Sequence, residues 1–307
     1  MSKSGIDFIG DIHGHAVELE KLLDKMGYSK RGKAWKHSDR LAFFVGDYID
    51  RGPQIPETLD IVRRMVDAGN AKAIMGNHEY NAICFHQEGE NGGHLREHSI
   101  KNVLQHHETL KQFRNQQKEY NEYIEWFKTL PLYYETNHFR AVHASWDDEN
   151  VKQLPDVNEN QPLSDDMLRH SAQKRTELYN AFDETLKGKE LELPKDLTFL
   201  DKDGNERSEV RIKWWEDPDG HTLRSFAVGK SYHLPDHPVE NSESFKDSHY
   251  KEDEKPIFFG HYWLRGNPSL YRNNICCLDY SVAKGGKLVA YRFDGEEDLM
   301  DEKLVFV

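Results

Sequence analysis

The stretch GDYIDRGP (Gly46 to Pro53) places two aspartates and an arginine directly after the apolar run Leu41 to Val45. Apolar runs of this length that end at glycine are typical of buried strands. Charged side chains at the buried end of a strand are costly unless they reach solvent or meet an ion or ligand. The loop therefore either turns outward, with Asp47 as a cap, or brings Asp47, Asp50 and Arg51 to a binding site.

Four other strand-like runs are also followed by carboxylate, imidazole or amide side chains. These side chains are Asp11 and His13, Asn77 and His78, His143, and His261. Oxygen and imidazole donors without thiol suit divalent Mn, Fe, Co, Ni or Zn. Two such cations about 3.5–4 Å apart are common in phosphatases and can share one carboxylate. Their charge would outweigh that of Asp11 and Asp47, so the site would attract phosphate, to which Arg51 could add a bidentate clamp.

Each feature taken alone has a more ordinary explanation. Asp11 alone would most often be a helix N-cap. His143 or His261 alone would more often be a buried histidine with satisfied hydrogen bonds. The joint occurrence of complementary donors at five strand ends is what favours a shared site. The other histidines, including the pair His106 and His107, are interpreted as surface residues.

The elements that must position these residues follow from the apolar periodicity. Strands are expected at Ile6–Gly10, Leu41–Val45 and Ala71–Met75, and helices that end at Gly27 and Gly69 follow the first two. Repeated strand–loop–helix units predict a parallel sheet with right-handed crossovers. The three charged loops would then lie at the carboxyl edge of that sheet, where open α/β sheets bind ligands.

The second half of the chain alternates strand signals with polar stretches. Strands are expected at Leu132–Tyr134, Phe139–Val142, Ile257–Phe259, Ile275–Tyr280 and Lys287–Phe293, the last two as a hairpin around Lys284–Gly286. The stretches from about 87 to 129 and from about 147 to 250 are interpreted as insertions that shape the substrate cleft. The second insertion is expected to be partly helical between Met167 and Leu186. We expect one catalytic domain over residues 1–307.

Composition limits the classes of partner. A net charge of −13 argues against a general nucleic-acid or anionic-membrane binder, because phosphate groups would be repelled. Three cysteines, two of them adjacent at Cys276 and Cys277, form neither a disulfide framework nor a zinc-ligand spacing. The N-terminus has no apolar signal region, and no run approaches about 18 apolar residues. A cytoplasmic protein without a membrane partner is expected, while the oligomeric state is left open.

Taken in order, the motifs GDIHG, GDYIDRG, GNHE, VHAS and FGHYW resemble those of the calcineurin-like metallophosphatases. The resemblance is to their phosphoprotein-phosphatase branch, which also contains the symmetrical diadenosine tetraphosphate hydrolases. It implies an α/β fold, a four-layer αββα sandwich with a dinuclear metal centre at the strand ends. The implied cofactor is a pair of divalent transition-metal ions, with Mn expected first and Fe, Zn, Co or Ni as alternatives.

The resemblance also implies roles for single residues. The implied metal ligands are Asp11 and His13 for the first ion, Asp47 for both ions, and Asn77, His143 and His261 for the second ion. A water or hydroxide shared by the ions would attack phosphorus, and His78, oriented by Asp50, would protonate the leaving oxygen. Arg51 and Asn77 would contact phosphate oxygens. The stretch WWEDPDGHTLRSF nominates Arg224 as the second phosphate-binding arginine, with Arg211 as the alternative.

The implied function is hydrolysis of a phosphomonoester, as in bacterial serine/threonine or tyrosine protein phosphatases. The alternative substrate is a nucleotide phosphoanhydride such as diadenosine tetraphosphate. In those hydrolases another residue commonly stands at the position of Asp50, because an anhydride leaving group needs less protonation, so Asp50 favours a phosphomonoester. A phosphatase of RNA ends, disfavoured by the net charge, and a binding protein without turnover are the remaining alternatives.

Overall fold

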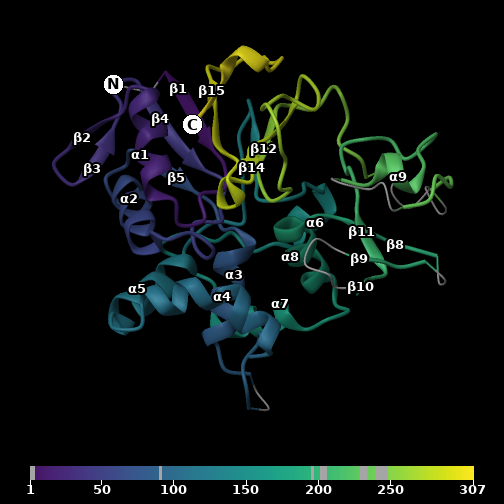
Figure 1. Cartoon of the computed structure of the whole chain (residues 1–307), viewed down its shortest axis with the longest axis horizontal. Helices are drawn as coiled ribbons and strands as arrows, with labels where there is room; N and C mark the ends of the chain where they lie inside the picture. The colour runs from purple at the N-terminus through teal and green to yellow at the C-terminus, as the bar shows by residue number, and fades with distance from the viewer. Residues whose placement is uncertain (1–3, 90–91, 195–196, 201–205, 229–233, 240–247) are drawn as a thin grey trace.

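The computed structural model describes residues 4–89, 92–194, 197–200, 206–228, 234–239 and 248–307 (Figure 1). Two sheets form its centre. The first has the order β14-β15-β1-β4-β5, with β16 beside β15, and the second has the order β13-β12-β7-β6. The strands of the first sheet are β1 (Gly5–Ile9), β4 (Arg40–Phe44), β5 (Ala71–Ala73), β14 (Asp279–Tyr280), β15 (Lys287–Phe293) and β16 (Leu304–Phe306). Those of the second are β6 (Tyr133–Glu135), β7 (Arg140–Val142), β12 (Ile257–Phe259) and β13 (Ile275–Cys277).

The parallel core of the first sheet is confirmed. β1 runs parallel to β4, which brings Ile9 opposite Phe44, and β4 runs parallel to β5, which brings Phe44 opposite Ala73. Helices α1 (Ala16–Lys25) and α2 (Ile55–Asp67) make the connections between these strands. The loops after the three strands therefore leave the sheet at the same edge.

The two sheets pack face to face through aromatic side chains. Phe8 of β1 stacks on Phe258 of β12 with ring centroids 3.7 Å apart, and Phe43 and Phe139 complete the contact. Apolar residues of α1 and α2 cover the outer face of the first sheet. The outer face of the second sheet is covered by Trp146 and the Trp214–Trp215 pair, with Val151 of α6 (Asp148–Gln153) packed beside them. The predicted αββα class is confirmed.

Part of the predicted hairpin is wrong. Only β14 pairs with β15, with Asp279 opposite Leu288, whereas β13 joins β12 in the other sheet. The chain crosses between the sheets at Leu278, whose backbone N–H donates to the carbonyl of Phe259. An apolar run that is buried in two sheets in succession has the same residue pattern as one long strand, so the sequence alone does not show the crossing.

The other helices and strands lie outside the two central sheets. The helices are α3 (Asn77–His86), α4 (Ile100–Gln112), α5 (Gln117–Phe127), α7 (Asp165–Ala172), α8 (Glu177–Lys187) and α9 (Leu223–Phe226), with single turns η1 (Val282–Lys284) and η2 (Asp301–Lys303). The small strands are β2 (Ser29–Arg31), β3 (Ala34–Lys36), β8 (Glu190–Glu192), β9 (Phe199–Leu200), β10 (Glu206–Arg207) and β11 (Glu209–Arg211). Helix was correctly predicted between Met167 and Leu186, and the insertion of about 147–250 lies partly outside the described residues. Within the described ranges, no helix combines the length and apolarity that a membrane span requires.

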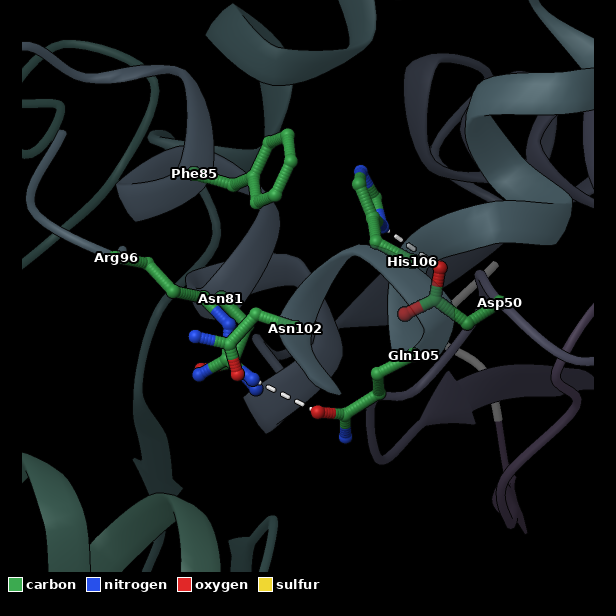
Figure 2. Close-up of a pocket in the computed structure, with 7 residues that line it drawn as sticks. All are labelled: Asp50, Asn81, Phe85, Arg96, Asn102, Gln105 and His106. Carbon is green, nitrogen blue, oxygen red and sulfur yellow. Dashed lines mark hydrogen bonds and ion pairs between the residues drawn. The ribbon is translucent and has the colours of Figure 1, made fainter. Parts of the chain in front are cut away.

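Helix α4 lies against the loop that follows β4. Its residue His106 faces Asp50 across a hydrogen bond, and both side chains form one wall of a pocket (Figure 2). Gln112, at the end of the same helix, donates to the carbonyl of Gly52 and accepts from the N–H of Ile55. The helix therefore holds this loop at several points.

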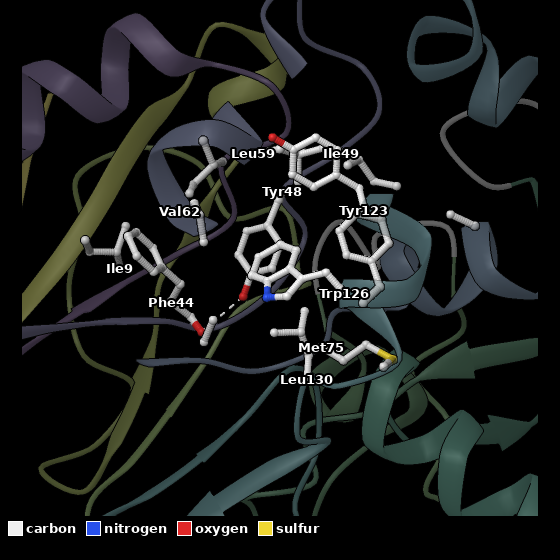
Figure 3. Close-up of a cluster of buried hydrophobic side chains, with 14 of the residues drawn as sticks. Ile9, Phe44, Tyr48, Ile49, Leu59, Val62, Met75, Tyr123, Trp126 and Leu130 are labelled. Atoms are coloured by element: carbon white, nitrogen blue, oxygen red, sulfur yellow. Dashed lines mark hydrogen bonds between the residues drawn. The ribbon is translucent and has the colours of Figure 1, made fainter. Parts of the chain in front are cut away.

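The same loop is held by side chains that are buried in the apolar core. Tyr48 and Ile49, which lie between Asp47 and Asp50, are both fully buried within it (Figure 3). The Tyr48 hydroxyl donates to the carbonyl of Ile74 at 2.6 Å. Burial of these two apolar side chains holds the loop down. This is how charged residues are kept in place at the buried end of a strand.

Candidate dinuclear metal centre

Asp47 lies at the centre of a cluster built from the strand ends. Its Oδ2 is 3.5 Å from His13 Nε2, and its Oδ1 is 3.4 Å from His143 Nε2. Two groups of side chains, each with ligand atoms within 4.8 Å of one another, could hold a metal ion, and they share Asp47: the groups are His13, Asp47 and His78, and Asp47, His143 and His261. A shared carboxylate between two donor groups is the arrangement that a dinuclear centre requires.

An amide oxygen completes the second group. Asn77 Oδ1 lies 3.1 Å from His143 Nε2 and 2.8 Å from His261 Nδ1. Asn77 is the first residue of α3, so the start of that helix carries its side chain into the cluster. With Asp47, the group offers two oxygen and two nitrogen donors, a set that suits borderline divalent metals.

Asp11 borders the cluster but does not belong to either group. Its Oδ2 accepts the backbone N–H of His261 at 3.0 Å, while its Oδ1 is buried without a hydrogen-bond partner. A Cβ on Gly260 would lie 1.9 Å from that oxygen, so only glycine leaves room for it. His13 Nε2 and His261 Nε2 are also buried without partners. Buried polar atoms are rarely left unpaired, so these residues fit bound cations.

Backbone groups orient the imidazole rings. His13 Nδ1 lies 2.9 Å from the carbonyl of Ile49, and His143 Nδ1 lies 2.8 Å from the carbonyl of Val45. A proton on each Nδ1 leaves the Nε2 lone pair directed at Asp47, which is the usual support for a metal-ligating histidine. His13, Asp47 and His261 have positive φ of 46°, 55° and 73°. Backbone strain of this kind concentrates at functional sites.

Electrostatics favours the ionisation states that metal binding needs at His13 and Asp47, but not at Asp11. Burial lowers the pKa of His13 to about 3, which keeps its ring neutral. Burial alone would raise the pKa of Asp47, but the neighbouring His143 and His78 hold it well below its usual range. The pKa of Asp11 is raised well above its usual value by burial and by the charges of Asp279 and Asp47. Cations between these carboxylates would relieve that repulsion.

Glu79, the last residue of GNHE, was not predicted as part of the site. It is fully buried, and its carboxylate accepts the backbone N–H groups of Asp47, Tyr48 and Gly76 at 2.8–3.0 Å. It therefore ties the loop that carries Asp47 to the start of α3. Its place in the GNHE motif, directly after Asn77 and His78, could have identified Glu79 as a site residue.

His78 and Asp50 form a tight pair. The Nδ1–H of His78 donates to Asp50 Oδ2 at 2.5 Å, while His78 Nε2 lies 3.9 Å from Asp47 Oδ2. Burial alone would raise the pKa of Asp50, but His106 and His78 hold it well below its usual range. The prediction that His106 lies on the surface was wrong, since it is 5% exposed and bonded to Asp50. The polar pattern of α4 gave no sign that this face packs against another polar segment.

Two of the three predicted arginines lie near the cluster. The guanidinium of Arg51 stacks on the ring of Trp263 at 4.3 Å. Arg211, on β11, is close enough to His261 for its charge to lower the pKa of that histidine, after burial. Arg224 lies on α9, which Figure 1 shows at the outer edge, and its Nε donates to the carbonyl of Leu234. The influence of Arg211 on His261 therefore favours Arg211, the alternative, over Arg224.

The chain is similar in sequence to known phosphoesterases. Residues 5–263 match the sequence model of the calcineurin-like phosphoesterases. An asymmetrical bis(5'-nucleosyl)-tetraphosphatase PrpE from Oceanobacillus iheyensis is 33% identical over 141 residues, which cover 45% of this chain and 54% of that protein. A symmetrical bis(5'-nucleosyl)-tetraphosphatase from Buchnera aphidicola is 26% identical over 312 residues, which cover 96% of this chain and 97% of that protein. The match thus spans about half of the first relative and nearly all of the second.

Solved structures share the fold. A protein serine/threonine phosphatase from Saccharomyces cerevisiae has a TM-score of 0.52 and 14% identity, covering 100% of this chain and 80% of that one. A cold-active protein-tyrosine phosphatase from a Shewanella species has a TM-score of 0.51 and 16% identity, covering 97% and 81%. At these identities the likeness concerns the fold alone.

Proposed function

The chain belongs to the calcineurin-like phosphoesterase family, and we propose that it is a metal-dependent hydrolase of phosphomonoesters. The hydrogen bond between His78 and Asp50 carries this proposal. A carboxylate that holds one nitrogen of an imidazole leaves the other nitrogen to deliver a proton, and an alkoxide or phenoxide leaving group needs that proton. His78 Nε2 faces Asp47, at the centre of the cluster.

The cluster would hold two divalent cations. Asp11 and His13 would bind one, Asn77, His143 and His261 the other, and Asp47 both; Mn is the ion proposed first. When bound, the cations supply Lewis-acid charge that stabilises negative charge on the phosphoryl oxygens and lowers the pKa of the attacking water.

The remaining steps belong to side chains of the chain itself. Arg51 and Arg211 would bind the non-bridging phosphoryl oxygens, where charge develops in the transition state. Stacking on Trp263 limits the motion of the Arg51 guanidinium, so less conformational freedom is lost when phosphate binds. His78 would hold a proton on Nε2 and transfer it to the departing oxygen. Asp50 would fix the ring and stabilise its charged form.

The second candidate is hydrolysis of dinucleoside polyphosphates. It is supported by the relatives named above, which include two bis(5'-nucleosyl)-tetraphosphatases. Rates on phenyl phosphate, a phosphoserine peptide and diadenosine tetraphosphate, measured with Mn, separate the two candidates. We expect the highest kcat/KM on the phosphomonoesters, and a clear preference for diadenosine tetraphosphate would favour the second candidate.

Arg51→Ala is expected to weaken phosphate binding and leave metal content unchanged. Losing a charge-assisted hydrogen bond costs about 1.5–3 kcal/mol, so kcat/KM should fall roughly tenfold or more. The inhibition constant of inorganic phosphate should rise in parallel. Metal analysis of the purified variant checks that the centre is intact, and a loss of metal would contradict the assignment.

A matched pair of variants tests whether Arg211 or Arg224 is the second phosphate-binding arginine. Arg211→Ala is expected to raise the inhibition constant of inorganic phosphate about tenfold. Arg224→Ala should change it less than about twofold, because Arg224 contacts the carbonyl of Leu234 and the carboxylate of Asp236 on the periphery. The reverse order of effects would restore Arg224 as the second phosphate ligand.

A further inference from the structure

One face of α4 reaches the loop that carries Asp50. His106, Thr109 and Gln112 are spaced by three residues, so they lie on the same side of the helix. The contacts of Gln112 hold the loop backbone, whereas those of His106 and Thr109 reach the carboxylate of Asp50. The metallophosphatase site therefore receives buried polar contacts from a segment outside all of its motifs.

Asp50 is held from several directions. The Thr109 hydroxyl accepts the backbone N–H of Asp50 at 3.0 Å and donates to its Oδ1 at 2.5 Å. His106 Nδ1 lies 2.8 Å from the same oxygen, while Oδ2 receives His78. Asp50 has a φ of 66°, a backbone conformation that needs such support in a residue other than glycine.

The chain of hydrogen bonds continues beyond His106. Its Nε2 lies 2.6 Å from the hydroxyl of Tyr120, which is 1% exposed. Burial raises the pKa of Tyr120 well above its usual value, so the hydroxyl keeps its proton and can donate it to Nε2. His106 then carries its own proton on Nδ1 and donates to Asp50. In this arrangement Tyr120, His106, Asp50 and His78 form one continuous chain of hydrogen bonds.

We propose that His106 is a positioning residue for catalysis, which with Thr109 and Tyr120 holds Asp50 so that it orients the proton donor His78. The proposal rests on the proposed function, because it requires that His78 protonates the leaving group. It also gives α4 a task beyond shaping the substrate cleft. A purely structural role for His106 would affect all substrates alike, whereas a role through the acid depends on the leaving group.

The first measurement compares substrates that differ in their need for a proton. His106→Ala is expected to lower kcat on phenyl phosphate about tenfold, a part of the 10²–10⁴-fold contribution of a general acid. On p-nitrophenyl phosphate, whose leaving group is stable as an anion, the loss should be under about threefold. KM should stay within about twofold on both substrates, since His106 would act through Asp50.

Conservative variants separate the hydrogen bond from the volume of the ring. His106→Asn keeps an N–H donor near the position of Nδ1 and should recover most of the activity on phenyl phosphate. Thr109→Val removes only the hydroxyl and should show the same selectivity for the poor leaving group. The neighbouring His107 is exposed on the same helix, so His107→Asn is the matched control and should change neither rate.

The pocket allows a direct chemical test. It is small and partly open to solvent, and His106 and Asp50 line one side while Phe85 and Arg96 line the other (Figure 2). Removal of the ring in His106→Ala would enlarge this pocket beside Asp50. Added imidazole should therefore raise the rate of the variant on phenyl phosphate, while the wild type and His78→Asn, assayed with the same imidazole, should not gain.

The outcomes separate failure of the inference from failure of the proposed function. Equal losses on both substrates in His106→Ala and Thr109→Val, with no rescue by imidazole, would overturn the positioning role. If His78→Asn itself showed no dependence on the leaving group, the proposed proton donor would be wrong and the inference would fall with it. Thermal unfolding shows whether His106→Ala is folded. If it is not, the rates of Thr109→Val and Tyr120→Phe on the two substrates provide the comparison.

Discussion

Asp47→Asn is expected to release more metal than any other single substitution in this protein. Asp47 is the only residue shared by the two donor groups of the described structure, and each of its oxygens faces a different imidazole. Loss of a supporting residue around a metal ligand costs about 10–100-fold in affinity, so loss of the shared ligand should cost at least as much. Metal analysis after dialysis against buffer with a weak chelator measures the effect.

The same experiment tests the number of ions. Wild-type protein is expected to carry close to two transition-metal ions per chain, and chelation should abolish an activity that Mn restores. Asp24→Asn, which changes an exposed aspartate on α1, is the control and should keep both ions. Full activity with a single bound ion would contradict the dinuclear account.

His78→Asn is expected to keep both metals and lower turnover on phenyl phosphate by about 10²–10⁴-fold, the range for a positioned general acid. Its ring is held by Asp50, so the loss should come from proton transfer and not from the metal centre. The reduction should be much smaller on p-nitrophenyl phosphate, because that leaving group departs with little need for a proton.

Two further results would change the role of His78. Its Nε2 lies in a possible metal group with His13 and Asp47, so metal content must be measured beside activity. Loss of one ion in His78→Asn would make it a ligand. Equal losses on both substrates with full metal content would mean that some other group protonates the leaving oxygen.

The core of the first sheet and the edge where polar side chains gather can be predicted from the amino-acid pattern. Apolar runs bounded by glycine mark the strands, and parallel strands place the loops after them on one side, so Asp11, Asp47 and Asn77 could be expected to meet. The type of donor at each strand end then predicted a harder or borderline divalent cation as the ligand. The strand order could be inferred because it depends on local pattern and on the direction of the chain.

Contacts between residues far apart in the sequence are seen only in the folded chain. His106 lies in a polar helix and looks like a surface residue, but that helix packs its polar face on the loop of Asp50. The sequence nominated Arg224 and kept Arg211 as the alternative, whereas the contacts of β11 and α9 in the folded chain favour Arg211. The run Ile275–Tyr280 is one apolar stretch that the fold divides between two sheets. The local sequence pattern predicts which residues can be buried. Which residues pack against one another depends on the contacts of the whole chain.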